Sequence, residues 1–179
     1  LVTFAAMARK NKKKVFHELE VIDAGAKGKA IAKAPDGKVV FIDNAVPGDI
    51  ADIQTYKKRK SYYYGKVSNY ISYSDKRTEP VCQHFGTCGG CKWQNMDYKY
   101  QLFYKQQEVE NNLRRLGKIE LPETTPISGS ENIYFYRNKM EFSFSDSRWL
   151  TLDEINSGED IEDKNALGFH IPGMWDKIL

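Results

Sequence analysis

Short runs of apolar and β-branched residues recur between residues 15 and 71, and each run ends at residues that favour turns. The dipeptide Asp36-Gly37 separates two of these runs, which predicts a β-hairpin at that point. A second turn is predicted at Pro47-Gly48-Asp49, and the stretch after it, IADIQTYKKRKSYYYGKVSNYIS, accommodates two more strands. Five short strands in so few residues predict a small, closed or nearly closed β-barrel of the oligonucleotide-binding (OB) kind.

The pattern changes after the barrel region. Residues 75–94 show little periodicity, so we expect a loop there. A helix is predicted from residue 95 onward, because apolar residues fall on one face and Gly117 supplies a stop signal. We expect that face to pack into the core, and its members are Leu102, Val109, Leu113 and Leu116.

Strict alternation returns in residues 133–145, IYFYRNKMEFSFS. In a strand, Tyr134, Tyr136 and Met140 would lie on one side, and Arg137 and Lys139 on the other. Together with SRWLTL and NALGFHI, this strand predicts an antiparallel sheet around an acidic loop at residues 153–163.

The predicted fold is therefore mainly β with an α+β part: a five-stranded OB-like barrel, a cysteine loop, one helix and an antiparallel sheet. A chain of 179 residues is long enough for one ordinary domain or two small ones. We expect four segments, namely a disordered basic arm at 1–14, the barrel at 15–74, the cysteine loop at 75–94 and an incomplete central α+β domain at 95–179.

Charge and composition limit the kinds of partner that this chain is expected to bind. The net charge is only +3, but residues 8–14, ARKNKKK, carry five positive charges, as arms that contact nucleic acid do. No apolar run approaches the roughly 18–20 residues of a membrane span, so we expect no membrane partner. Clustered cysteines, odd in number, favour the reducing cytoplasm and a bound metal or cluster over disulfides. We expect a monomer.

All three cysteines, Cys82, Cys88 and Cys91, lie in the stretch CQHFGTCGGC. The spacing C-x5-C-x2-C puts three thiols on one tight loop, and Gly89 and Gly90 let its backbone direct N–H groups at sulfur, which suits an iron–sulfur cluster. Structural zinc more often uses two separated C-x2-C pairs or a later Cys/His pair. Zinc and the absence of any bound species stay open as alternatives, and a cluster complete within this chain would point to His170 as its fourth ligand.

The stretch YKKRKSYYYGK interleaves basic residues with tyrosines. Phosphates attract cations, and unpaired bases stack on flat rings, so this mixture suits single-stranded or looped RNA. The alternative is that the tyrosines pack the barrel and the lysines are only solvated. The predicted RNA-binding residues are Lys12, Lys13, Lys14, Lys57, Lys58, Arg59, Lys60, Tyr62, Tyr64, Arg137 and Lys139.

The segment CQHFGTCGGCKWQNMDYKYQLFYKQQEV closely resembles the cysteine segment of the RNA 5-methyluridine (uracil-C5) methyltransferases. The preceding strands resemble the TRAM domain that opens many of these enzymes, with VPGD as its turn. YFYRNKMEFSFS is similar to a strand of the family's central domain. The resemblance covers about residues 15–175.

The resemblance implies that Cys82, Cys88 and Cys91 hold a [4Fe–4S] cluster, with a fourth cysteine that follows the central sheet. We therefore expect the cluster to be incomplete or absent in this chain. It also implies an S-adenosylmethionine-dependent methyltransferase acting on structured RNA, with 23S ribosomal RNA the expected substrate. Alternatives are a transfer RNA uracil-C5 methyltransferase, or a stand-alone, non-catalytic RNA-binding module with a metal knuckle.

The family's chemistry needs a further cysteine that attacks C6 of uracil, and a glycine-rich turn that binds the methyl donor. This chain has neither. We therefore expect no catalytic residue within it, and we expect it to be the amino-terminal part of a longer enzyme.

Overall fold

The structure is a computed structural model that describes residues 13–179. Its elements in chain order are β1 (Val15–Gly25), the short 3-10 helix η1 (Ala26–Gly28), β2 (Lys29–Lys33), β3 (Val39–Asp43), β4 (Ile50–Lys58), β5 (Tyr62–Ser72), α1 (Tyr98–Arg115), β6 (Ser143–Ser145), α2 (Leu152–Ser157) and β7 (Ala166–Gly168). The expected fold class is confirmed, with a short second helix added. Most of the predicted basic arm, including Lys12, lies outside the described residues.

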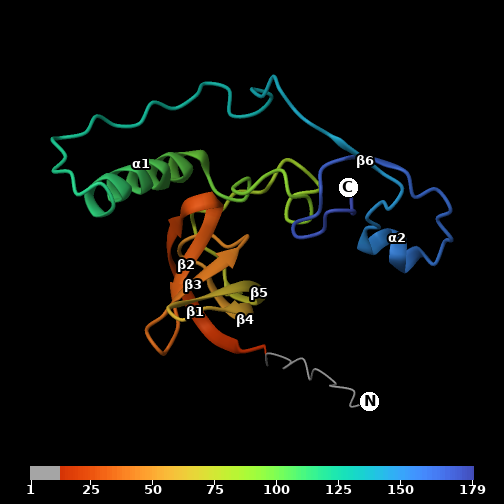
Figure 1. The fold of residues 1–179 in the computed structure, drawn as a ribbon, viewed down its shortest axis with the longest axis horizontal. Coiled ribbons are helices and arrows are strands. Elements are labelled where there is room, and N and C mark those ends of the chain that lie inside the picture. The colour runs from red at the N-terminus through yellow and green to blue at the C-terminus, as the bar shows by residue number, and fades with distance from the viewer. Residues whose placement is uncertain (1–12) are drawn as a thin grey trace, which may run out of the picture.

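The barrel closes in the strand order β1-β2-β3-β5-β4, and β4 pairs back to β1 (Figure 1). Every pair is antiparallel except β3 with β5, which run parallel. The predicted hairpin at Asp36-Gly37 joins β2 to β3, and Gly37 adopts a φ of 78° there. The predicted turn at Gly48 joins β3 to β4 with a φ of 98°, a conformation that costs glycine little.

Small residues fill much of the barrel interior. Val40, Ile42 and Ile53 are fully buried, and several alanines lie between them in the same core. A five-stranded barrel has a narrow interior, which is filled by alternating small and large side chains. A register shift in β1 places both Phe16 and Leu19 inward although they are three positions apart, so strict alternation fails there.

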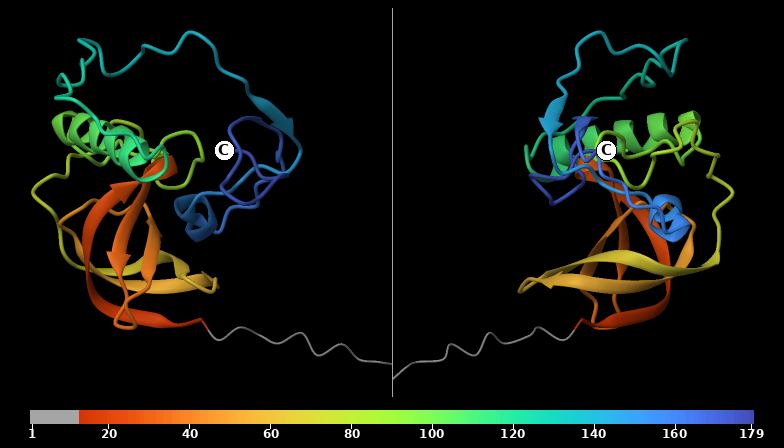
Figure 2. Two further views of the ribbon diagram at one scale, coloured as in Figure 1. Left: turned by 60° about the vertical axis from the view of Figure 1, so that its left-hand side comes forward. Right: turned by 90° about the vertical axis from the view of Figure 1, so that its right-hand side faces the viewer.

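Helix α1 lies across one end of the barrel (Figures 1 and 2). Asp97 begins the helix, since its side chain accepts a hydrogen bond from the Lys99 N–H at 3.1 Å. A second apolar cluster joins the helix to the barrel and consists of Ala24, Val46, Met96 and Tyr104. The barrel and α1 therefore share buried surface.

A buried carboxylate connects the barrel to the chain that leaves it. Asp49 is fully buried in the β3–β4 turn and accepts hydrogen bonds from the backbone of Val46 and Ser74 at 2.7 and 3.0 Å. The Arg77 guanidinium donates two more bonds to it, both of 2.7 Å, and packs against the rings of Tyr70 and Tyr73. The expected boundary near residue 74 stays a prediction, but this ion pair crosses it.

The prediction that the apolar face of the helix packs into the core is wrong in part. Val109 and Leu116 are 58% and 80% exposed, and only Tyr104 of α1 is buried. The barrel is too small to cover more than one stretch of the helix, and it meets Tyr104 rather than the predicted face. The helix ends close to the predicted stop, but Lys118, not Gly117, takes the left-handed conformation.

The strand predicted over residues 133–145 is also wrong for most of its length. Only Ser143–Ser145 forms a strand, which pairs with β7 so that Phe144 lies opposite Leu167. A strand needs a hydrogen-bonding partner, and within residues 13–179 no other backbone pairs with residues 133–142. Phe135 is fully exposed as a result.

The stretch SRWLTL, predicted as a strand, leads instead into helix α2, which takes in the start of the expected acidic loop. Thr151 and Glu154 form a reciprocal capping box that begins this helix.

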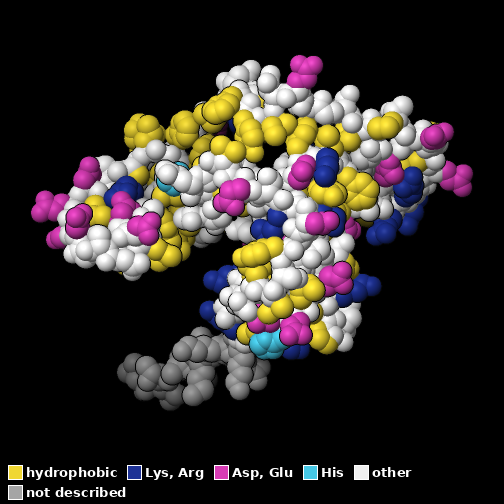
Figure 3. All heavy atoms as spheres, turned by 180° about the vertical axis from the view of Figure 1, so that it is seen from behind, with side chains coloured by type: hydrophobic (Ala, Val, Ile, Leu, Met, Phe, Trp, Pro, Cys, Tyr) yellow, Lys and Arg dark blue, Asp and Glu magenta, His cyan; other side chains and the backbone are white. Residues whose placement is uncertain are grey.

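Exposed apolar side chains gather over the upper part of the molecule in Figure 3, above the barrel. Residues 133–145 include several exposed apolar side chains, namely Phe135, Tyr136, Met140, Phe142 and Phe144. Exposed apolar surface of this kind is typical of sites that contact other protein segments. Within the described part of the chain, no helix is long and apolar enough to cross a membrane.

Candidate nucleic-acid interface

Four of the predicted cations lie at the tip of the β4–β5 hairpin. Lys57 and Lys58 end β4, Arg59 and Lys60 form the turn, and the Arg59 N–H donates to the Tyr62 carbonyl at 2.8 Å. All four side chains are exposed. None of the ion pairs formed by residues 13–179 includes any of them, so their charges are available to an external anion.

The strand that follows divides its tyrosines between two faces. Tyr62 and Tyr64 lie on the outer face, whereas Tyr63 is 3% exposed and packs edge-on against Phe16 inside the barrel. The Tyr63 hydroxyl donates to Asp36 at 2.8 Å. The packing interpretation is therefore confirmed for Tyr63, whereas RNA contact by Tyr62 and Tyr64 stays a prediction.

The outer tyrosines belong to an aromatic cluster that spans three strands. Tyr64 pairs with Phe41 of β3 across the parallel ladder, and their ring centroids lie 5.6 Å apart. The Tyr62 ring meets both, at 5.5 Å from Phe41 and 5.4 Å from Tyr64. The amino groups of Lys29 and Lys57 lie 5.8 and 5.9 Å from the Tyr64 ring centroid, within the range of cation–π attraction.

A β-bulge in β4 adds Tyr56 to this cluster. Thr55 pairs with Gly65 and Lys57 with Tyr64, which leaves Tyr56 as the extra residue between them. The Tyr56 ring stacks on Tyr64 with an interplanar angle of 14° and a centroid distance of 6.2 Å. Its hydroxyl donates to Asp43 at 2.8 Å, and Asp43 also forms an ion pair with Lys29.

The phenols of Tyr56 and Tyr64 stay neutral at physiological pH because their pKa values are raised. Burial raises the pKa of Tyr56 above its ordinary value, and the hydrogen bond to Asp43 raises it further. Burial, followed by the neighbouring Tyr62, likewise raises the pKa of Tyr64. Neutral rings do not repel phosphate, so the cluster is compatible with the cations beside it.

The remaining predicted RNA-binding residues do not join the hairpin. Lys13 and Lys14 are exposed, and the Lys14 carbonyl extends the barrel edge by accepting the Thr55 N–H at 2.8 Å. Arg137 and Lys139 lie outside any strand, so the shared sheet face predicted for them is wrong. The Arg137 guanidinium donates to the Lys139 carbonyl at 2.9 Å, and Lys139 pairs with Glu141 at 3.2 Å. Their role in RNA binding stays a prediction.

Sequence reasoning missed Phe41 and Lys29 and did not single out Tyr56. Phe41 carries a detectable signal, since it is the outward residue of the alternating run VVFID. Tyr56 carries the same signal, because it follows the buried Thr55 in the alternating pattern of β4.

The cysteines lie in a loop of consecutive turns between the barrel and α1. Cys82 and Cys91 are exposed and Cys88 is half-buried. The Gly90 N–H approaches the Cys88 sulfur at 3.3 Å, and the Gln94 side-chain amide approaches the Cys91 sulfur at 3.2 Å. N–H donors to sulfur are typical of loops that hold thiolates.

The two glycines of the loop face a distant part of the chain. The Gly89 N–H donates to the His170 carbonyl at 3.1 Å, and a Cβ atom on Gly89 would lie only 2.6 Å from that oxygen. A Cβ atom on Gly90 would meet the Phe169 ring at an ordinary 3.5 Å. Figure 1 shows the two segments side by side. Glycine is thus required at position 89 by the close approach of the His170 carbonyl, as well as by the tight turn of the cysteine loop.

The donor types in this loop fit a thiolate-ligated cluster, with three thiols and N–H groups aimed at two of them. Within residues 13–179, no three His, Cys, Asp or Glu side chains are grouped as metal ligands. The His170 ring nitrogen lies 3.0 Å from the Ser143 hydroxyl.

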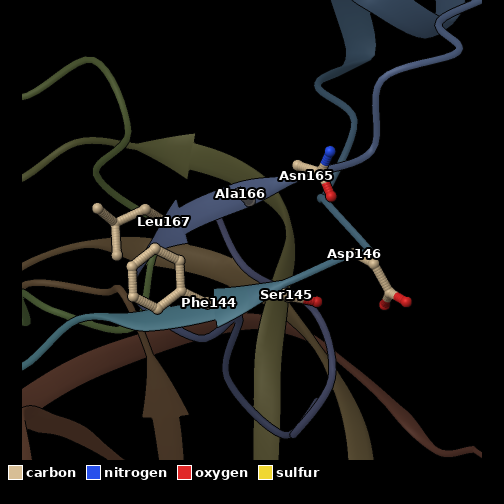
Figure 4. Close-up of a pocket in the computed structure, with 6 residues that line it drawn as sticks. All are labelled: Phe144, Ser145, Asp146, Asn165, Ala166 and Leu167. Carbon is tan, nitrogen blue, oxygen red and sulfur yellow. The ribbon is translucent and has the colours of Figure 1, made fainter.

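An open hollow is lined by residues of β6 and β7 and by the residues next to them (Figure 4). Phe144 and Leu167 come from the two facing strands, and Asp146 and Asn165 lie at the other end. The hollow contains none of the predicted site residues.

Comparison of the sequence with those of known proteins finds relatives that match most of this chain. No protein-family model matches it. A protein of Bacteroides thetaiotaomicron is 52% identical over 154 residues, which are 86% of this chain and 34% of that protein. One of Porphyromonas gingivalis is 44% identical over 164 residues (90% and 35%), and one of Chlorobaculum tepidum is 38% identical over 164 residues (90% and 34%). All three are named uncharacterized RNA methyltransferases. The chain spans about a third of the length of each of these relatives, and the match covers most of the chain itself.

Proposed function

We propose that this chain is the RNA-binding and cluster-bearing part of an S-adenosylmethionine-dependent RNA (uracil-C5-)methyltransferase of the cytoplasm. The observation that carries the proposal is the β4–β5 hairpin, where four exposed cations that form no ion pair within residues 13–179 adjoin an outward aromatic cluster. Cations bind phosphates and rings stack bases, and the tip of the β4–β5 hairpin is one of the places where OB folds bind oligonucleotides.

The proposed role of this chain is binding rather than chemistry. In the reaction that the family resemblance implies, a cysteine thiolate adds to C6 of uracil, C5 then takes the methyl group of S-adenosylmethionine, and a base removes the C5 proton to release the thiolate. All three cysteines of this chain are assigned to the loop of residues 82–91. The proposed nucleophilic thiolate therefore comes from outside it.

We propose that Cys82, Cys88 and Cys91 hold three irons of a [4Fe–4S] cluster. Such a cluster supplies metal–thiolate bonds that cross-link the loop. After anaerobic reconstitution, iron and acid-labile sulfide should bind to the natural chain and fall sharply in Cys88→Ser. Equal amounts in the two proteins would contradict the assignment, and zinc in place of iron and sulfide would favour the zinc alternative.

We propose ribosomal RNA as the substrate, with transfer RNA as the competing possibility. The support is the family resemblance of the cysteine segment, which is shared by enzymes of both kinds.

The Bacteroides thetaiotaomicron relative offers the direct test, because it contains a region that matches 86% of this chain. Ribosomal and transfer RNA transcripts labelled with tritium at uracil C5 are incubated with that protein and S-adenosylmethionine. Methylation at C5 releases the tritium, so we expect release from ribosomal RNA, and none when the 179-residue chain is used alone. Methyl transfer without tritium release would contradict the uracil-C5 assignment, and release from transfer RNA only would correct the substrate.

A further inference from the structure

We propose that the outer face of β3, β4 and β5 is a stacking platform for unpaired RNA bases, formed by Phe41, Tyr56, Tyr62 and Tyr64. This inference deepens the proposed function and rests on its RNA-binding part. It specifies which face of the barrel contacts RNA and which form of RNA that face binds.

The β-bulge at Tyr56 is the first argument. Tyr56 follows the inward Thr55 in the alternation of β4 and therefore lies outward, whereas regular alternation would turn Lys57 inward. The bulge instead sets Lys57 opposite Tyr64, so that Tyr56 and Lys57 both lie beside the Tyr64 ring, and the Tyr56 ring is nearly parallel to it. Bulges often re-aim side chains at functional sites.

The surroundings of Tyr56 hold its ring in place without covering it. Its hydroxyl is tied to Asp43, and Asp43 is in turn neutralised by Lys29. The side chain nevertheless stays 49% exposed. Because the hydrogen bond of its hydroxyl already fixes the orientation of the ring, the ring loses little conformational entropy when a base stacks on its exposed part.

The cations are placed for the backbone of the same strand of RNA. Lys57 lies directly opposite Tyr64 in the β4–β5 ladder. A phosphate-binding charge and a base-stacking ring therefore lie one strand spacing apart, about 5 Å. A duplex offers phosphates to such a surface but keeps its bases stacked on one another, so the rings discriminate in favour of single strands.

The test measures binding of the 179-residue chain to oligouridine of about ten nucleotides, a length within the range that one OB fold covers. An RNA duplex of the same length and an abasic strand serve as comparison probes. In the variant Tyr56→Leu/Tyr64→Leu the apolar bulk remains but the rings are lost. In Tyr56→Phe/Tyr64→Phe the rings remain. Phe103→Ala removes a similarly exposed ring, 56% exposed, from α1 as a control.

We expect the leucine variant to bind oligouridine about tenfold more weakly or worse, with duplex binding nearly unchanged. The phenylalanine variant and Phe103→Ala should stay within about twofold of the natural chain. If the double leucine variant does not fold by circular dichroism, Tyr56→Leu alone, at the exposed bulge, provides the comparison.

Two outcomes overturn the platform alone: oligouridine binding that is insensitive to loss of both rings, or equal affinity of the natural chain for the abasic strand. In either case RNA binding remains and the proposed function stands. Failure of the natural chain to bind any of the three probes at low salt would instead overturn the proposed function, and the platform with it.

Discussion

At the scale of single residues, the strongest constraint in the molecule is the carboxylate of Asp49. It is fully buried, and its two oxygens accept bonds from two backbone N–H groups and the Arg77 guanidinium. A buried charge is tolerated only where its partners are complete. The side chain of Asp49 therefore holds the β3–β4 turn, the end of β5 and the exit segment together.

Removing one partner should leave that charge unsatisfied. We expect Arg77→Ala to lower the free energy of unfolding by about 3–5 kcal/mol, measured by urea denaturation. Arg114→Ala is the matched control, because it breaks an exposed pair with Glu110 on α1 and should cost less than about 1 kcal/mol. Similar losses in both variants would show that the buried pair has no special role.

Asp36 supplies a pH-dependent contribution. The hydrogen bond from Tyr63 is the main reason why the pKa of Asp36 falls to about 2 from an ordinary 3.8. Between these two values the unfolded chain binds more protons at this site, so stability rises with pH across that window. The contribution is complete above pH 3.8 and is lost as pH falls to about 2.

We therefore expect Asp36→Asn to be less stable than the natural chain at pH 5, with the difference shrinking as pH falls through that window. Denaturant unfolding at a series of pH values measures it, and Asp160→Asn, in the acidic stretch outside the barrel, controls for the lost charge. A difference independent of pH would contradict the assignment.

At the scale of elements, the barrel was predictable because its strands carry local signals. Turn residues such as Asp36-Gly37 and Gly48 separate runs that alternate, and each strand of the barrel pairs within about 70 residues of sequence. The segment 133–142 alternates just as clearly but forms no strand, because pairing depends on a partner that alternation alone cannot supply. Helix α1 was predictable in position, but not in its buried face, which is set by the size of the barrel end that it covers.

The close approach between the cysteine loop and residues 169–172 predicts a sharp difference between two neighbouring glycines. Gly89→Ala would press a methyl group against the His170 carbonyl, whereas Gly90→Ala meets only ordinary contacts. We expect faster amide exchange at residues 169–179 in Gly89→Ala, measured by hydrogen–deuterium exchange, and little change in Gly90→Ala. Equal exchange in the two variants would mean that the loop does not hold this segment.

At the scale of the whole molecule, the chain combines a compact barrel with α1 and a more open C-terminal part. The candidate RNA-binding surface lies entirely on the barrel, where Phe41, Tyr56, Tyr62 and Tyr64 adjoin the cations at 57–60. The cysteine loop lies between the two parts and contacts the second through Gly89. The cations were predictable from the sequence, whereas the absence of ion pairs to them within residues 13–179 emerged only from the fold.

The salt dependence of RNA binding tests the central claim most directly. Lys57→Glu/Lys58→Glu/Lys60→Glu removes three phosphate contacts, so the slope of log affinity against log salt should become shallower by roughly 2, and affinity should fall. The control Lys105→Glu/Lys118→Glu/Lys164→Glu makes the same change in net charge at exposed positions away from the hairpin. We expect the control to keep nearly the natural slope. An unchanged slope in the hairpin variant, or the same loss in both, would contradict the claim that this hairpin binds the RNA backbone.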